Sequence, residues 1–116
     1  MKTLFILNDP PYGTERSYNG LRLAGNLANK HEQTEVDVFL MGDAVACAKA
    51  GQTTPNGYYN LERMLKPITR KGPVLLCGTC MDARGLKETE ITEGCRRSTL
   101  DELTQLTAQA DKVLVF

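Results

Sequence analysis

The sequence has no tryptophan, one histidine and no hydrophobic run long enough to cross a membrane. Its 14 basic residues balance its 14 acidic ones, so net charge provides no general attraction to nucleic acid or to an anionic lipid surface. The apolar run Leu4–Leu7, which follows Lys2 and Thr3, is too short for the core of a signal peptide. We therefore expect a cytoplasmic protein that neither spans a membrane nor binds nucleic acid directly.

What the chain does contain is enough apolar material for one core. It has 116 residues, 41% of them hydrophobic, and no low-complexity tract, which is typical of a globular domain of common size. The sequence predicts one domain covering residues 1–116. In a reducing cytoplasm we expect its four cysteines to be free thiols rather than disulfides.

Strand-like and helix-like segments alternate along the chain. Four short segments are predicted strands because they are apolar or alternate in polarity: residues 2–7, 35–41, 73–77 and 112–116. Apolar residues recur at helical spacing in the segments between them, which predicts helices over residues 15–30, 44–50, 61–68 and about 100–110. Thr14 is predicted to cap the first helix, and Thr99 with Glu102 forms a capping-box pattern for the last.

This alternation predicts an α/β fold, with a parallel sheet of four or five strands and helices on both faces. In such sheets, ligands bind beyond the carboxyl ends of the strands. Three turns follow these ends in the sequence: Asn8–Gly13, Met41–Asp43 and Cys77–Cys80. We expect the three turns to converge on one rim of the sheet.

The third of these turns carries the strongest chemical signal, a Cys-Gly-Thr-Cys sequence directly after an apolar strand. The sulfur of Cys77 is expected to face the amides that open the next helical turn, and such dipoles favour the nucleophilic thiolate. Arg84 would add positive charge if the chain folds back. We interpret Cys77 as functional and leave Cys80 open between a functional and a packing role, whereas Cys47 and Cys95 are interpreted as packing residues.

Other cysteine chemistries fit the sequence less well. A thioredoxin-like pair would follow an early strand, whereas this pair follows the third predicted strand. A zinc site needs four ligands, but the chain has no second closely spaced cysteine pair and only His31 in addition, so further ligands would come from scattered residues or neighbouring subunits. We predict no metal site built by the chain alone and no bound cofactor.

Three other motifs are incomplete. The loop Asn8–Gly13 matches neither the dinucleotide-binding nor the Walker pattern. Arg96 and Arg97 follow Cys95 without the spacing of a cysteine phosphatase, and we interpret them as solvated charges. Ser17 lacks the histidine and acid partners of a catalytic triad.

Four stretches of the sequence, taken in order, resemble a known family. They are NDPPYGTERSYNGLRLA, VDVFLMGDAV, LLCGTCMDARG and LTAQADKVLVF. Together they span nearly the whole chain, and they are similar to the DsrE/DsrF-like group of small sulfur-relay proteins, most closely to its YchN-like members.

The resemblance implies a five-stranded, largely parallel α/β fold that assembles into homotrimers or homohexamers. It also implies a cysteine that carries sulfur as a persulfide between donor and acceptor proteins. In the relay branch the working cysteine stands seven residues before an Arg-Gly pair, and Cys77 stands seven before Arg84-Gly85. The resemblance therefore assigns this role to Cys77. Cys80 has no counterpart in the relay proteins, although a second cysteine is common among the YchN-like members.

The leading hypothesis is a sulfur carrier or sulfurtransferase-like protein in which Cys77 accepts sulfane sulfur, Cys80 modulates it and Arg84 favours the thiolate. Two roles remain open for Cys80: it attacks a Cys77 persulfide and releases hydrosulfide, or it only supports the site. The competing hypothesis is a non-enzymatic oligomeric module that binds a small ligand or a partner and whose cysteines only pack.

Overall fold

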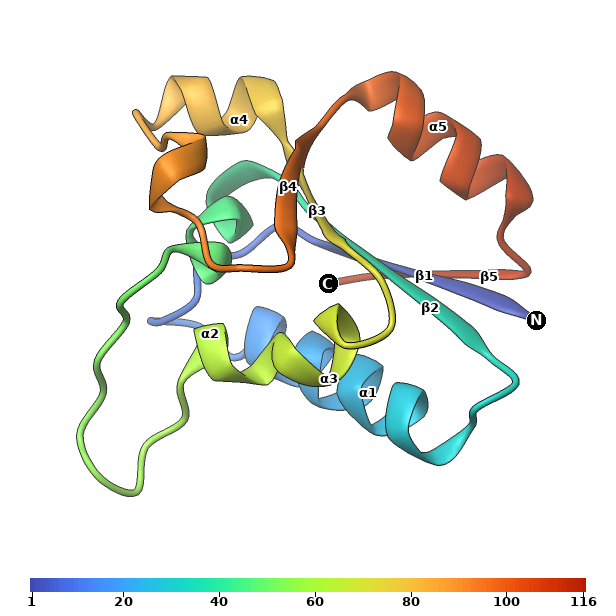
Figure 1. The fold of residues 1–116 in the computed structure, drawn as a ribbon, viewed down its shortest axis with the longest axis horizontal. Coiled ribbons are helices and arrows are strands. Elements are labelled where there is room, and N and C mark those ends of the chain that lie inside the picture. The colour runs from blue at the N-terminus through green and yellow to red at the C-terminus, as the bar shows by residue number, and fades with distance from the viewer.

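A parallel sheet runs through the middle of the protein, and helices lie on both sides of it (Figure 1). The computed structural model describes all 116 residues. In chain order, the elements are β1 (Lys2–Leu7), α1 (Arg16–Lys30), β2 (Glu35–Leu40), the 3-10 helix η1 (Gly42–Ala48), α2 (Leu61–Met64), α3 (Lys66–Thr69), β3 (Val74–Cys77), α4 (Gly78–Ala83), the 3-10 turn η2 (Glu88–Glu90), β4 (Cys95–Ser98), α5 (Leu100–Gln109) and β5 (Lys112–Val115).

The five strands lie in the order β4-β3-β2-β1-β5, and every neighbouring pair is parallel. This confirms the predicted single-domain α/β architecture. The strand that the sequence does not reveal is β4, whose Cys-Arg-Arg-Ser sequence shows no apolar pattern. It lies at the edge of the sheet, where a short and charged strand is tolerated because one side of it faces solvent. In the β3–β4 register, Leu76 stands opposite Arg97 and Cys77 opposite Ser98.

Strand side chains alternate between two apolar layers, as the pleat of a strand requires. On one face, helices α1 to α3 and η1 cover a layer of buried strand residues: Phe5, Leu7, Val38, Leu40, Val74 and Leu76. On the opposite face, Leu103 of α5 packs against Leu4, Phe39 and Leu75. Both layers are needed to bury a parallel sheet, and together they fix the end of β3 from two sides.

Helix α1 approaches β1 closely because Gly20 has no side chain. A Cβ atom at this position would lie 2.5 Å from Cδ2 of Leu7 and 3.2 Å from the ring of Phe116. The ring of Phe116 stacks in turn on Phe5, with 6.2 Å between the centroids. Substitution of Gly20 by alanine would therefore force the side chain of Leu7 to move.

Two predicted helix features are wrong in detail. Glu15, not Thr14, stands at the cap position of α1, because the hydroxyl of Thr14 donates to the carboxylate of Asp9 instead (3.0 Å). The predicted helix over residues 61–68 is divided into α2 and α3 at Leu65, since Pro67 in the first turn of α3 has no amide to continue the hydrogen-bond ladder.

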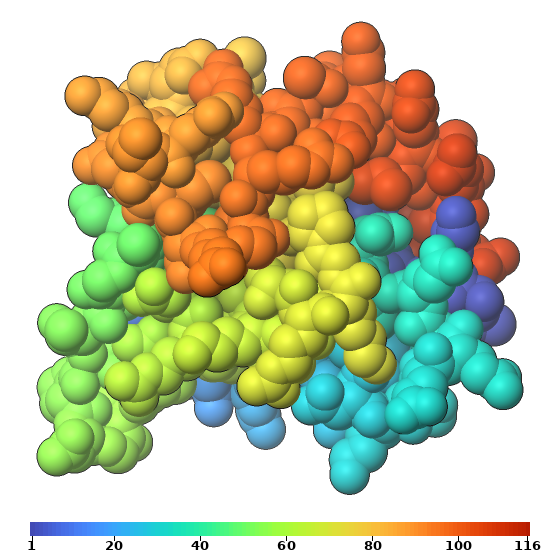
Figure 2. All heavy atoms as spheres, in the orientation of Figure 1, coloured from blue at the N-terminus to red at the C-terminus, as the bar shows by residue number.

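The segment predicted as a helix over residues 44–50 is also different. It forms the 3-10 helix η1, which starts at Gly42 and ends at Ala48. The loop before β4 lies beside α3, and the space-filling view shows these two segments in contact on one face (Figure 2). A Cβ atom on Gly94 of this loop would lie 2.6 Å from Cβ of Thr69.

The last helix begins as predicted, but its capping box is half formed. Thr99 accepts a hydrogen bond from the amide of Glu102 (3.2 Å), which confirms Thr99 as the cap. The carboxylate of Glu102 does not return to the cap. It accepts two hydrogen bonds from Arg96, at 2.9 and 2.6 Å, and another from Ser98.

The C-terminal strand β5 is an edge strand and pairs only with β1. Leu114 and Phe116 pack against the core beside α1, while Val113 and Val115 point to the other face and are 37% and 64% exposed. The protein therefore presents an apolar strand edge to solvent. None of its helices has the length and apolarity that crossing a membrane requires.

The three predicted turns converge on one rim of the sheet, at the carboxyl ends of β1, β2 and β3. The amide of Met41 donates to the carbonyl of Leu7 (3.0 Å), which ties the second turn to the end of β1. Gly42 adopts φ +57°, a conformation that favours glycine, and a Cβ atom there would lie 3.2 Å from the carbonyl oxygen of Asn8. The amide of Gly42 faces the sulfur of Cys80, which joins the third turn to the other two.

Candidate functional site

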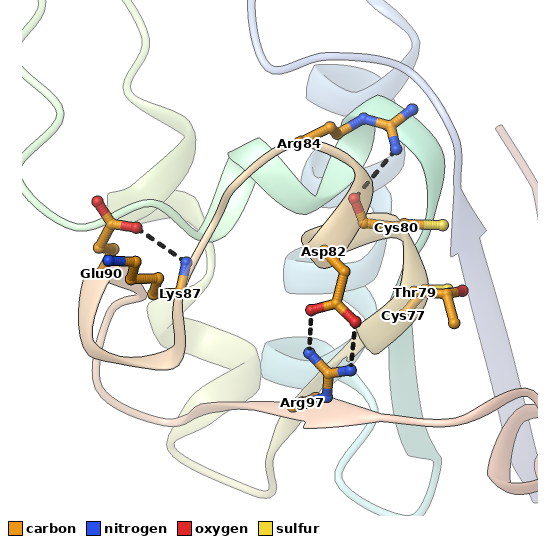
Figure 3. A network of polar contacts seen from close by, with 8 residues as sticks. All are labelled: Cys77, Thr79, Cys80, Asp82, Arg84, Lys87, Glu90 and Arg97. Atoms are coloured by element: carbon orange, nitrogen blue, oxygen red, sulfur yellow. Dashed lines mark hydrogen bonds and ion pairs between the residues drawn. The ribbon is translucent and has the colours of Figure 1, made fainter.

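Cys77 is the last residue of β3, and α4 starts at the next residue. Its side chain is 9% exposed, so the sulfur lies at the boundary between the core and solvent. The sulfur contacts the hydroxyl of Thr79 at 3.3 Å. Thr79, Cys77 and Cys80 lie together on one side of α4 (Figure 3). The abrupt strand-to-helix transition thus places this thiol among several hydrogen-bond donors.

These donors change the acidity of the Cys77 thiol. Burial by itself raises the pKa, because it disfavours the charged thiolate. The thiol of Cys80, the hydroxyl of Thr79 and the backbone amides of both residues act in the opposite direction. Together they outweigh burial and lower the pKa of Cys77 below its ordinary value. Cys77 is therefore the thiol at this rim that ionises first.

Cys80 is shifted in the opposite direction. Burial raises its pKa, and so do the hydrogen bond that it donates to Cys77 and the negative charge of the Cys77 thiolate. The amide of Gly42 and the charge of Arg84 offset part of this rise. The two cysteines thus form an unequal pair, in which Cys77 ionises more readily than Cys80.

Arg84 lies beside Cys80 rather than beside Cys77. Its Nε donates to Oδ1 of Asp43 at 2.8 Å, and its Nη1 donates to the carbonyl of Cys80 at 3.1 Å (Figure 3). The chain does fold back after α4, but the guanidinium is held against η1. Its positive charge acts on the thiol of Cys80.

A second arginine, Arg97, also lies near the site, although the sequence predicted a solvated charge at this position. Arg97 donates two parallel hydrogen bonds to Asp82 of α4, each 2.8 Å long (Figure 3). A Cβ atom on Gly78 would lie 2.7 Å from Cζ and from Nε of this side chain. Arg97 therefore crosses the first residue of α4, directly after Cys77.

The charge of Arg97 also interacts with the site. Asp82 is the main cause that raises the pKa of Arg97, and the negative charge of Cys77 adds to it. The sequence did not predict this position of Arg97 because it did not reveal β4. The pairing of β4 with β3 brings Arg97 beside α4. The neighbouring Arg96 pairs with Glu102 instead and takes no part in this contact.

The other two cysteines have a different setting. Cys47 in η1 is fully buried, and burial raises its pKa to about 12 despite a hydrogen bond with Ser17. Burial and the charge of Glu62 raise the pKa of Cys95 to about 12. All four thiols are free. At neutral pH, Cys47 and Cys95 are protonated packing groups.

The structure brings together no three histidine, cysteine, aspartate or glutamate side chains that could hold a metal ion. His31 is exposed after α1, remote in sequence from the cysteine pair. A groove of about 670 Å³ lies along α1 and is bordered by Met64 and Pro67, and Cys77 is not part of its lining.

Comparison with known proteins agrees with this architecture over the whole chain. A model of the DsrE/DsrF-like family matches residues 1–116. The chain belongs to the DsrE/DsrF-like family. Protein YchN of Escherichia coli K12 is 41% identical over 116 residues, which cover 99% of this chain and 98% of that protein. The crystal structure of the E. coli ychN protein superimposes with a TM-score of 0.93, again over 99% and 98% of the two chains.

More distant proteins share the same fold. Protein MJ0989 of Methanocaldococcus jannaschii is 38% identical over 117 residues, the full length of both chains. The structure of MTH1491 from Methanobacterium thermoautotrophicum has a TM-score of 0.72 at 13% identity and covers 99% of this chain and 98% of that chain. The DsrE/DsrF-like family is associated with sulfur relay, and its membership gives the thiol site a chemical context.

Proposed function

We propose that the protein carries sulfur as a persulfide on Cys77, as a carrier or sulfurtransferase-like member of a cytoplasmic sulfur relay. The observation that carries the proposal is the set of donors on the Cys77 sulfur, which lower the pKa of this thiol despite its burial. A thiolate is the form that attacks sulfane sulfur. Family membership supports the same chemistry.

The proposed transfer needs no external oxidant or reductant. The Cys77 thiolate attacks the outer sulfur of a donor persulfide and forms a new S–S bond, while the donor's own sulfur leaves as a thiolate. An acceptor thiolate then attacks the outer sulfur on Cys77 and restores the Cys77 thiolate. Cys80 stabilises the resting thiolate by donating to it, and Arg84 acts on Cys80.

The experiment is to incubate the protein with a small-molecule persulfide and weigh it intact. The Cys80→Ser variant is the informative one, because serine keeps a hydroxyl donor beside Cys77 and cannot form an internal disulfide. This variant should gain the mass of one sulfur atom, and a further Cys77→Ser substitution should abolish the gain. Cys95→Ser is the matched control and should leave it unchanged. Absence of the adduct, or its persistence without Cys77, would contradict the carrier role.

We also propose that copies of the chain associate as a homotrimer or homohexamer through the edge strand β5. The exposed Val113 and Val115 support this, because an apolar strand with unpaired backbone groups favours association with another chain. Light scattering should give a multiple of the single-chain mass, and Val115→Lys should shift it towards the monomer. A monomer at micromolar concentration would contradict the proposal.

A further inference from the structure

Cys80 is the nucleophile placed to act on a sulfur atom bound to Cys77. The two residues stand three apart at the start of α4, and side chains at this spacing are neighbours on a helix, with about 5–6 Å between Cβ atoms. The ionisation of each thiol depends on the other. Cys80 is only partly buried, and it contacts the apolar layers on both sides of the sheet. No other cysteine lies at this junction, since Cys47 belongs to η1 and Cys95 to β4.

Cys80 has its own stabilising groups, distinct from those of Cys77. The amide of Gly42 points at its sulfur, and the guanidinium of Arg84 is held beside it by Asp43 and by the carbonyl of Cys80 itself. Both groups favour a negative charge on Cys80. They come from the β2–η1 turn and from the end of α4, whereas the donors to Cys77 belong to the first turn of α4.

We propose that Cys80 discharges the sulfur carried by Cys77, so that the protein is a persulfide reductase as well as a carrier. This inference rests on the proposed function. The Cys80 thiol passes its proton to the terminal sulfur of the Cys77 persulfide, and the resulting Cys80 thiolate attacks the inner sulfur. The bond to the outer sulfur breaks, and hydrosulfide leaves with the bonding electron pair. The products are a Cys77–Cys80 disulfide and hydrosulfide. The outer sulfur is reduced by two electrons, and the cysteine pair is oxidised by two.

The hydrogen-bond donors around the two cysteines make the attack by Cys80 depend on whether Cys77 carries a sulfur atom. In the unloaded protein, ionisation of Cys77 raises the pKa of Cys80, through the negative charge and the hydrogen bond between the two side chains. When sulfur is attached, the negative charge moves outward to the terminal sulfur, and the inner sulfur becomes a weaker acceptor and an electrophile. The Gly42 amide and Arg84 remain beside Cys80 and favour its ionisation. A dithiol reductant of the thioredoxin class would then return the disulfide to the thiol pair.

The test follows the fate of the adduct after loading. Wild type and Cys80→Ser are loaded with a small-molecule persulfide, separated from it by gel filtration, and sampled for intact mass and released sulfide. The wild-type adduct should convert to a species two hydrogen atoms lighter than the unloaded protein, with one equivalent of sulfide. In Cys80→Ser, the adduct should persist without sulfide release.

Two arginine variants test the assignment of the stabilising groups. Arg84→Gln should slow the release of sulfide several-fold, while Arg96→Gln, a charge removal of the same kind away from the pair, should match wild type. A wild-type adduct as long-lived as that of Cys80→Ser would overturn the reductase inference and leave the carrier role standing. Absence of an adduct in both proteins would overturn the two together.

Discussion

The four cysteines of this chain occupy two kinds of setting, and both the depth of burial and the hydrogen-bond donors differ between them. Burial is the largest single influence at each of the four thiols, and at each it raises the pKa. At Cys47 and Cys95 it prevails and brings the pKa to about 12. At Cys77, several donors converge on one sulfur and reverse the direction. The reactive thiol is therefore defined by weaker burial together with several donors.

The same principle separates the two cysteines of the rim. Cys77 and Cys80 share a turn, but one sulfur receives hydrogen bonds from the first turn of α4 while the other donates to its neighbour. The two thiols of the pair therefore differ in acidity, and Cys77 is the more acidic one.

The largest expected effect is the loss of fast alkylation when Cys77 is replaced. In the native protein at neutral pH, iodoacetamide should modify one thiol at least about tenfold faster than the others, because only Cys77 has a lowered pKa. Cys77→Ser should remove this fast phase. Cys80→Ser should retain it, since serine still donates to the Cys77 sulfur. A fast phase that depends on Cys80 would reverse the assignment within the pair.

The next largest effect is the pH dependence of stability that a buried thiol creates. The ordinary pKa of Cys47 is 9.0 and its native value is about 12, so between these values the unfolded chain loses a proton that the native protein keeps. The free energy of unfolding should then fall as pH rises, by about 1.4 kcal/mol per pH unit from this thiol. Below the unfolded pKa both states hold the proton, and the contribution is constant.

Urea unfolding at a series of alkaline pH values measures this slope. Cys47→Ala should show a shallower slope than wild type by the amount given above, although its stability at neutral pH is lower because a buried sulfur is lost. Comparison of the two slopes cancels the titration of lysines and tyrosines. Equal slopes would show that Cys47 ionises in the native protein as easily as in the unfolded chain.

A smaller effect is expected when one donor to Cys77 is removed. Thr79→Val deletes the hydroxyl 3.3 Å from the sulfur and keeps a side chain of similar size. The pKa of Cys77 should rise, and alkylation at neutral pH should slow by roughly fivefold, which corresponds to one hydrogen bond of ordinary strength, about 1 kcal/mol. Thr79→Ser, which keeps the hydroxyl, should behave as wild type. An unchanged pH profile for Thr79→Val would remove this hydroxyl from the account.

The smallest effect tests whether Arg97 acts on Cys77 through its positive charge or only holds the structure in place. Arg97→Gln should raise the pKa of Cys77 and slow its alkylation by about two- to threefold, because the pair with Asp82 is exposed and screened by solvent. Asp82→Asn should act in the opposite direction, since it removes the anion that neutralises Arg97. Arg96→Gln serves as the control from the same strand. If both members of the pair shifted the pH profile in the same direction, Arg97 would be only a structural clamp.

Much of the fold follows from local patterns in the sequence. The strands β1, β2 and β3 are rich in apolar residues, so the sequence alone predicts that they lie in a buried sheet. Thr99 caps α5, as its position in the sequence predicts. The edge strand β4 carries two arginines, and its strand conformation depends on pairing with β3. No local pattern in the sequence of β4 predicts this pairing. Because β4 was not predicted, the position of Arg97 beside α4 was not predicted either.

The site shows a similar division. The spacing of Cys77 and Cys80 after an apolar strand is enough to select the pair, because the strand end and the following turn are local features. The asymmetry between them depends on which sulfur faces the donors in the first turn of α4, and the amide of Gly42 beside Cys80 reduces it. Likewise, the place of Arg84 depends on the path of the chain after α4, which turns the guanidinium towards Asp43.

The most direct test is a pH profile of alkylation resolved by site, with all four thiols of the native wild-type protein quantified by peptide mass spectrometry in the same samples. We predict that Cys77 reacts first, with an apparent pKa below its ordinary value of 9.0. Cys80 should follow at higher pH, and Cys47 and Cys95 should react only when the protein unfolds. A pKa of Cys77 at or above the ordinary value would contradict the account and favour an oligomeric binding module whose cysteines only pack.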